Sequence, residues 1–184
     1  QCLVGSEMCI RDRYHFYQKR GYESFFTRRE LFFEPKGRAE HPDTRTLSLK
    51  PVSLSEYYPK HINRIPQESI LWDEEILCFA ERESILYGGG LYVLMEGQNE
   101  LCICNIYRYK EEEVIVKELL LQQGVLQQQA IEALRDLFLQ CRVTIRLTGT
   151  DKENRVPSGM IRFYGPKEDM PENTQMAYLP FLLD

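Results

Sequence analysis

The pattern that most constrains the fold is a succession of strand-like segments interrupted by a single long amphipathic helix. Three strand-like segments come first, over residues 91–96, 101–109 and 113–121, and the first two are joined by a Gly97-Gln98-Asn99 turn. A helix is then predicted over 125–140, because apolar side chains recur there every three or four positions, at Leu126, Ala130, Leu134, Leu137, Phe138 and Cys141. Residues 142–147 alternate as a further strand. A meander followed by a helical crossover predicts a mixed sheet, mostly antiparallel and flanked by helices, in an α/β (α+β) domain.

Further elements are predicted on both sides of this core. A strand over 46–52 precedes a helix over 53–63, and a second helix begins near Trp72. Three carboxylates crowd the start of that second helix, as suits its positive end, and its buried face is predicted to hold Trp72, Ile76, Phe79 and Ala80. Residues 148–158 are predicted as a loop, and 160–164 and 177–183 as the last two strands.

The N-terminal part follows a different plan. Residues 14–22 read as the last two turns of a helix, with Gly21 as its left-handed C-terminal residue. Residues 23–33 suit a strand or a strand pair, and the Pro- and Gly-bearing segment 35–45 suits a linker. Residues 1–13, QCLVGSEMCIRDR, continue none of these patterns and resemble translated sequencing-adapter DNA; a genuine N-terminal tail is the alternative.

Composition excludes several classes of function. The net charge of −5 argues against nonspecific nucleic-acid binding, which depends on neutralising phosphates. No apolar run approaches the roughly 20 residues of a membrane span. The six cysteines are predicted to be free thiols of a cytoplasmic protein, and because no second Cys or His pair accompanies Cys102 and Cys104, no metal site is expected.

Two features resemble the GNAT acetyltransferase family. Residues 16–22, FYQKRGY, resemble the F-Y-x-K-x-G-F signature that closes the fourth helix of GNAT domains, and the element order after residue 46 resembles the GNAT fold without that helix. The C-terminal residues resemble the end of bacterial tandem-GNAT proteins. The resemblance implies that residues 14–34 end a truncated catalytic GNAT domain, that 35–45 form the linker, and that 46–184 form a degenerate second domain.

The resemblance also implies a reaction. The intact parent would move an acetyl group from acetyl-CoA to a small-molecule or peptide primary amine. Tyr17 would be the general acid, Phe16 would flank the cofactor arm, and Asp184 could place a terminal carboxylate in the first domain's site. The family's phosphate loop, Q/R-x-x-G-x-G/A, is matched at 121–126 only by Gly124, so this chain is expected to bind no cofactor and to be inactive by itself. A non-enzymatic binding or assembly domain is the alternative, and the oligomeric state stays open.

Overall fold

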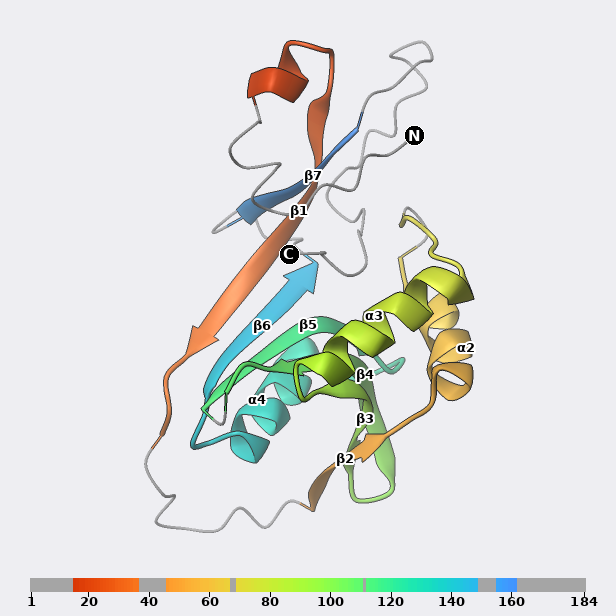
Figure 1. Cartoon of the computed structure of the whole chain (residues 1–184). Helices are drawn as coiled ribbons and strands as arrows, with labels where there is room; N and C mark the ends of the chain where they lie inside the picture. The colour runs from red at the N-terminus through yellow and green to blue at the C-terminus, as the bar shows by residue number, and fades with distance from the viewer. Residues whose placement is uncertain (1–14, 37–45, 67–68, 111, 149–154, 162–184) are drawn as a thin grey trace. The chain divides into compact units, whose positions relative to one another are not determined.

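The computed structural model describes residues 15–36, 46–66, 69–110, 112–148 and 155–161. The chain divides into two compact units, which are taken separately (Figure 1). The terminal unit comprises Gln1–Arg29, Pro66–Ile70 and Thr148–Asp184, and the central unit comprises Glu30–Ile65 and Leu71–Leu147. The boundaries inferred from the sequence at 14–34, 35–45 and 46–184 remain a prediction.

The central unit is built on a mixed sheet. Its strands are β2 (Leu47–Pro51), β3 (Gly90–Glu96), β4 (Asn99–Arg108), β5 (Glu113–Leu121) and β6 (Arg142–Thr148), side by side in that order, with the end of β1 (Glu23–Phe33) beside β6. Strands β2 to β5 pair antiparallel in succession, and β5 pairs parallel with β6. The predicted fold class, a mixed and mostly antiparallel sheet flanked by helices, is confirmed.

Three helices cover the two faces of this sheet. Helices α2 (Leu54–Arg64) and α3 (Glu74–Leu86) contact each other and the sheet, and α4 (Gln127–Leu137) is the crossover between β5 and β6 (Figure 1). Side-chain hydrogen bonds fix the starts of α2 and α3. The Glu56 carboxylate accepts from the Ser53 N–H at 3.1 Å, and the Asp73 carboxylate accepts from the Ile76 N–H at 2.9 Å. None of the helices in the described ranges is both long and apolar enough to cross a membrane.

The main core lies between the sheet and α4. It holds Cys102, Cys104 and Ile106 of β4 together with Leu134 and Phe138 from the α4 segment. The four cysteines among the described residues are free thiols, two of them buried in this core and two half-buried, which confirms the expectation for these four. The hydrogen bond with the Cys102 thiol, burial and the nearby Glu118 carboxylate raise the pKa of Cys104 well above its ordinary value, so this thiol is inert at neutral pH.

Three residues of the predicted helix faces were wrong, namely Ile76 and Phe79 of α3 and Leu126 before α4, whereas Ala80 and the rest of the α4 stripe lie in or against the core as predicted. On α3 the buried residues are Leu77, Ala80 and Ser84, whereas Ile76 and Phe79 are 42% and 58% exposed. Trp72 is buried, but it lies before the N-cap and therefore does not set the rotational phase of the helix. Leu126 was expected on the buried stripe of α4, but it is the N-cap residue and is 72% exposed.

A close backbone approach joins α3 to β3. The chain leaves α3 through Gly88 and Gly89 before β3 begins at Gly90. A Cβ atom on Gly89 would lie 1.8 Å from the carbonyl oxygen of Ile106, which is far too close for two non-bonded atoms. Only glycine therefore fits between α3 and the neighbouring strand β4.

The terminal unit contains a helical turn over residues 15–18 and the pairing of β1 with β7 (Arg155–Ile161). The two strands are antiparallel, from Glu23 opposite Ile161 to Arg29 opposite Arg155. The prediction of a loop up to 158 and a strand from 160 was therefore wrong, because β7 begins at Arg155. Proline is tolerated within such an edge strand where its missing N–H is not needed for the ladder. The strand predicted over 177–183 lies outside the described residues.

Candidate functional site

The segment that carries the family signature ends a helix as the sequence predicted. Gly21 has a φ of +78°, and its N–H donates to the Gln18 carbonyl at 3.0 Å. The Tyr22 N–H donates to the Tyr17 carbonyl at 3.2 Å. This pair of bonds around a left-handed glycine is a Schellman motif, so the predicted C-terminal role of Gly21 is confirmed.

Aromatic contacts hold the two candidate residues of this helix end. The Tyr17 ring meets Phe16 and Tyr22 edge-to-face, at centroid distances of 5.4 and 5.6 Å. The Arg20 guanidinium lies 3.4 Å from the Phe16 ring centroid, and Arg20 also donates to the Phe16 carbonyl at 3.2 Å. Tyr17 is thus half-buried and held by its neighbours, while Phe16 is exposed beneath a cation. The acid role of Tyr17 and the cofactor-flanking role of Phe16 stay predictions.

The third candidate, Asp184, lies outside the described residues, and so does the 1–13 segment. No group of three or more potential metal-ligating side chains occurs in the described ranges.

The turn between β5 and α4 is where the resemblance would place a phosphate loop. The Val125 N–H donates to the Gln122 carbonyl at 3.0 Å, and Gly124 turns the chain with a φ of +84°. Leu126 then caps α4 without a side-chain hydrogen bond. A pyrophosphate cradle requires consecutive N–H groups and small residues that admit the ligand to the backbone. Here Val125 and Leu126 put bulky side chains beside the helix start, so these residues do not fit the group.

A β-bulge interrupts β5 a few residues before that loop. Asn105 is opposite Glu118 and Ile106 is opposite Val116, so Lys117 is an extra residue in β5. The parallel pairing of β5 with β6 extends only from Glu113 to Val116. The two parallel strands are therefore paired up to the bulge and not beyond it.

The bulge brings buried polar groups to the α2 side of the sheet. Glu118 is fully buried, and its Oε2 accepts a hydrogen bond from the Tyr57 hydroxyl at 2.6 Å. The Nδ1 atom of His61, also fully buried, lies 3.3 Å from the same oxygen, and the His61 ring stacks on Tyr57. Tyr57 and His61 are one turn apart on α2. We refer to Tyr57, His61 and Glu118 as the buried polar cluster.

Two further polar side chains adjoin this cluster. Asn105 is fully buried opposite Glu118, and neither of its side-chain amide atoms has a hydrogen-bond partner among the described residues. Lys117 is buried as well, with its Nζ 4.0 Å from the centroid of the Tyr107 ring. A carboxyl group beside an imidazole has the chemistry of a proton-transfer pair. Because Tyr57 and His61 enclose Glu118, a substrate cannot reach it in this conformation.

An ion-pair network ties the end of α2 to β4 and to the loop after β5. Lys60 Nζ lies 2.6 Å from the Glu100 carboxylate, and Arg64 contacts both Glu100 and the side-chain oxygen of Gln122. Partial burial raises the pKa of Glu100, but the hydrogen bonds and charges of Lys60 and Arg64 outweigh it, so that the pKa is lowered overall. The two cations of α2 are thereby committed to a structural carboxylate.

Sequence reasoning missed the buried polar cluster. His61 lies near the end of a predicted helix, and the pair Lys117-Glu118 lies inside a predicted strand, and no role was predicted for any of the three. The available signal was a Lys-Glu pair within the otherwise apolar run VIVKELLL, since charged residues are seldom fully buried without a partner.

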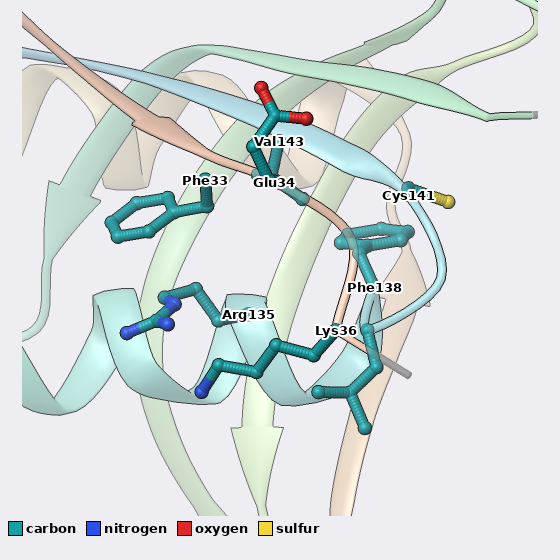
Figure 2. A pocket seen from close by; sticks show the side chains of 8 residues that line it. Phe33, Glu34, Lys36, Arg135, Phe138, Cys141 and Val143 are labelled. Atoms are coloured by element: carbon teal, nitrogen blue, oxygen red, sulfur yellow. The ribbon is translucent and has the colours of Figure 1, made fainter. Parts of the chain in front are cut away.

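A small hollow of the central unit lies between the end of β1 and α4. Figure 2 shows Arg135 and Phe33 beside each other at its wall, with the guanidinium 4.4 Å from the ring centroid. The other lining residues are Glu34, Lys36, Phe138, Leu139, Cys141 and Val143. Its volume of ≈ 10 Å³ accommodates about one water molecule, so it is no site for an organic ligand.

No protein-family model matches this chain, and no curated protein matches it by sequence. Similar solved structures include a conserved protein of unknown function from Enterococcus faecalis, described as a probable N-acyltransferase, with 14% identity and a TM-score of 0.49 over 75% of this chain and 37% of that one. A GCN5-related N-acetyltransferase from Anabaena variabilis gives 15% identity and 0.44, over 81% of this chain and 42% of that one. A GCN5-related N-acetyltransferase from Kribbella flavida gives 15% and 0.42, over 74% and 34%. The chain thus spans less than half the length of these three proteins, and at TM-scores below 0.5 the likeness supports no assignment of fold family or role.

Proposed function

We propose that this chain is the C-terminal part of an N-acyltransferase of the GNAT type, which moves an acetyl group from acetyl-CoA to a primary amine. The observation that carries the proposal is the Schellman motif at Gly21, because it gives the FYQKRGY segment the helix end that the family signature requires. The antiparallel meander, the α4 crossover and the parallel pair that stops at the Lys117 bulge support the same proposal.

In this proposal Tyr17 is the acid of the complete protein. The amine nitrogen attacks the thioester carbonyl and loses a proton to solvent, the carbon–sulfur bond breaks, and the departing thiolate takes a proton from the Tyr17 hydroxyl, which regains one from solvent. A tyrosine hydroxyl is a suitable donor because it carries its proton at neutral pH. The packing of Tyr17 between Phe16 and Tyr22 limits the directions in which this hydroxyl can point.

The central unit is proposed to be noncatalytic. Among the described residues of this unit, the buried carboxyl group beside an imidazole is that of Glu118, and Tyr57 and His61 enclose it. Its turn after β5 lacks the small residues of a phosphate loop. Acetyl-CoA is accordingly a substrate of the complete protein and not a ligand of this chain.

Calorimetric titration of the 184-residue chain with acetyl-CoA tests the noncatalytic part. We expect no binding tighter than about 100 μM, or roughly −5.5 kcal/mol. Tighter binding would contradict the proposal for the central unit.

The catalytic part is tested on the complete coding sequence, by release of free CoA thiol with a panel of primary amines. Tyr17→Phe keeps the ring but removes the donor, and we expect kcat to fall on the order of 10²-fold. Tyr22→Phe is the matched control, because it alters a neighbouring phenol that has no proposed role, and it should leave kcat unchanged. An unchanged single-turnover rate for Tyr17→Phe would refute the acid assignment.

A further inference from the structure

Helix α3 carries an apolar stripe on the side that faces away from the sheet. Phe79 and Leu86 are 58% and 85% exposed, and Leu71, just before the helix, is 67% exposed. Glu75 and Arg82 are exposed as well. Glu75, Phe79, Arg82 and Leu86 follow one another at spacings of four, three and four residues and therefore share one face of the helix. Several large apolar side chains on one face of a helix indicate an interaction surface.

The stripe borders a hollow in the surface of the central unit. The hollow has a volume of ≈ 570 Å³ and is lined by Leu54, Glu74, Glu75, Cys78, Phe79 and Arg82. Its volume exceeds that of any single side chain. The centre of the stripe therefore offers both a projecting phenyl ring and a depression beside it.

The stripe is also self-complementary. About the midpoint between Cys78 and Phe79, Glu75 is the counterpart of Arg82 within the helix. If a second copy of α3 is laid antiparallel on the first, Glu75 meets the oppositely charged Arg82 at two points. The structure records no ion pair for Glu75 or Arg82 within the described part of the chain, so both charges are available.

We propose that the chain forms a two-fold dimer through antiparallel pairing of α3 with α3 of a second copy. Glu75 faces Arg82 of the partner subunit twice, once on each side of the axis, as an isologous interface requires. Phe79 lies nearest the axis and enters the hollow of the partner subunit. The like-charged counterparts Glu74 and Glu83 do not oppose this pairing, because the Glu83 carboxylate turns inward and accepts from the Tyr107 hydroxyl at 2.6 Å.

The size of the surface sets the expected strength. Helix α3 has 13 residues and is about 20 Å long, so a single helix pair buries less than the roughly 1,200 Å² of a standard stable interface. We therefore expect a dissociation constant on the order of micromolar. The pairing goes beyond the proposed acyltransferase function and does not depend on it.

Sedimentation velocity of the 184-residue chain between about 1 and 300 μM tests the proposal. Glu75→Arg and Arg82→Glu each place like charges together at two points, and each should weaken the dimer about tenfold or more. The double exchange restores both pairs and should return the dissociation constant to that of the parent chain. Phe79→Asp should abolish the dimer, whereas Leu126→Asp, an equally exposed apolar site on the other side of the sheet, should leave it unchanged.

A chain that stays monomeric over this range would overturn the proposal. So would a dimer whose strength is indifferent to the charge exchanges, or a double exchange as weak as the single ones. Circular dichroism of each variant establishes that its fold is retained. None of these outcomes bears on CoA binding, so failure here is distinct from failure of the proposed function.

Discussion

Removing the Tyr57 hydroxyl should destabilise the central unit by about 2 kcal/mol. This hydroxyl donates to Glu118 at 2.6 Å, and both side chains are fully buried, so no water can replace the lost donor. A buried acceptor deprived of one partner costs about 1–3 kcal/mol. His61 stays near the same oxygen in Tyr57→Phe, and for this reason we place the cost in the middle of the range rather than at its end.

Urea denaturation followed by tryptophan fluorescence measures this cost. Trp72 is the sole tryptophan and is buried in the central unit, so its signal reports on that unit. With a slope of about 1–3 kcal/mol per molar urea, a loss of 2 kcal/mol lowers the midpoint by roughly 1 M. Tyr58→Phe is the matched control, because Tyr58 is the next residue of α2 and is only half-buried. The free energy of unfolding of this variant should differ from that of the parent by less than about 0.5 kcal/mol.

A double-mutant cycle decides whether the hydrogen bond itself is responsible. Combining Tyr57→Phe with Glu118→Gln should show a coupling energy of about 1–2 kcal/mol. A coupling near zero, or a Tyr57→Phe variant as stable as the parent, would refute the argument that the carboxyl group depends on this donor.

Three other outcomes are expected. Gly89→Ala should destabilise the central unit by about 3 kcal/mol or more, because its Cβ meets strand backbone at 1.8 Å, whereas Gly97→Ala, with open space but a φ of +60°, should cost only about 1 kcal/mol in the same urea assay. Glu100→Gln should lower stability at pH 7, and this loss should shrink as the pH falls below 4.5: the pKa of Glu100 is lowered in the folded chain, so its contribution is present above the ordinary value of 4.5 and is lost as the pH falls through the folded value. Native-state alkylation followed by mass spectrometry should leave Cys102 and Cys104 unmodified, and labelling of either without unfolding would contradict their burial.

Elements with a strong local signal could be predicted from the sequence. The meander, the crossover helix and the parallel strand after it followed from apolar periodicity and turn residues. Gly21 was found because few residues other than glycine end a helix in the left-handed region. The buried face of α3 was not found, because its apolar residues lie all around the helix and only packing against the sheet selects Leu77 and Ala80 over Phe79.

The candidate site could be predicted only where it depends on contiguous residues. The FYQKRGY helix end is such a case. The buried polar cluster instead joins Glu118 to Tyr57, 61 positions earlier, and to His61, 57 positions earlier. The bulge that brings them together has no local sequence pattern. The start of β7 was missed for a similar reason, since its pairing partner lies far away in β1.

The extra residue Lys117 reverses the parity of β5. Before it, Val114 and Val116 point toward α4; after it, Leu119 and Leu121 do so, and Glu118 turns to the α2 side. A strictly alternating alignment or design of this strand would assign every residue after the bulge to the wrong face. Regular alternation with Lys117 kept in the ladder would carry the Glu118 carboxyl group into the apolar layer and strip α2 of its anchor. The bulge is therefore as strict a constraint on this strand as its composition.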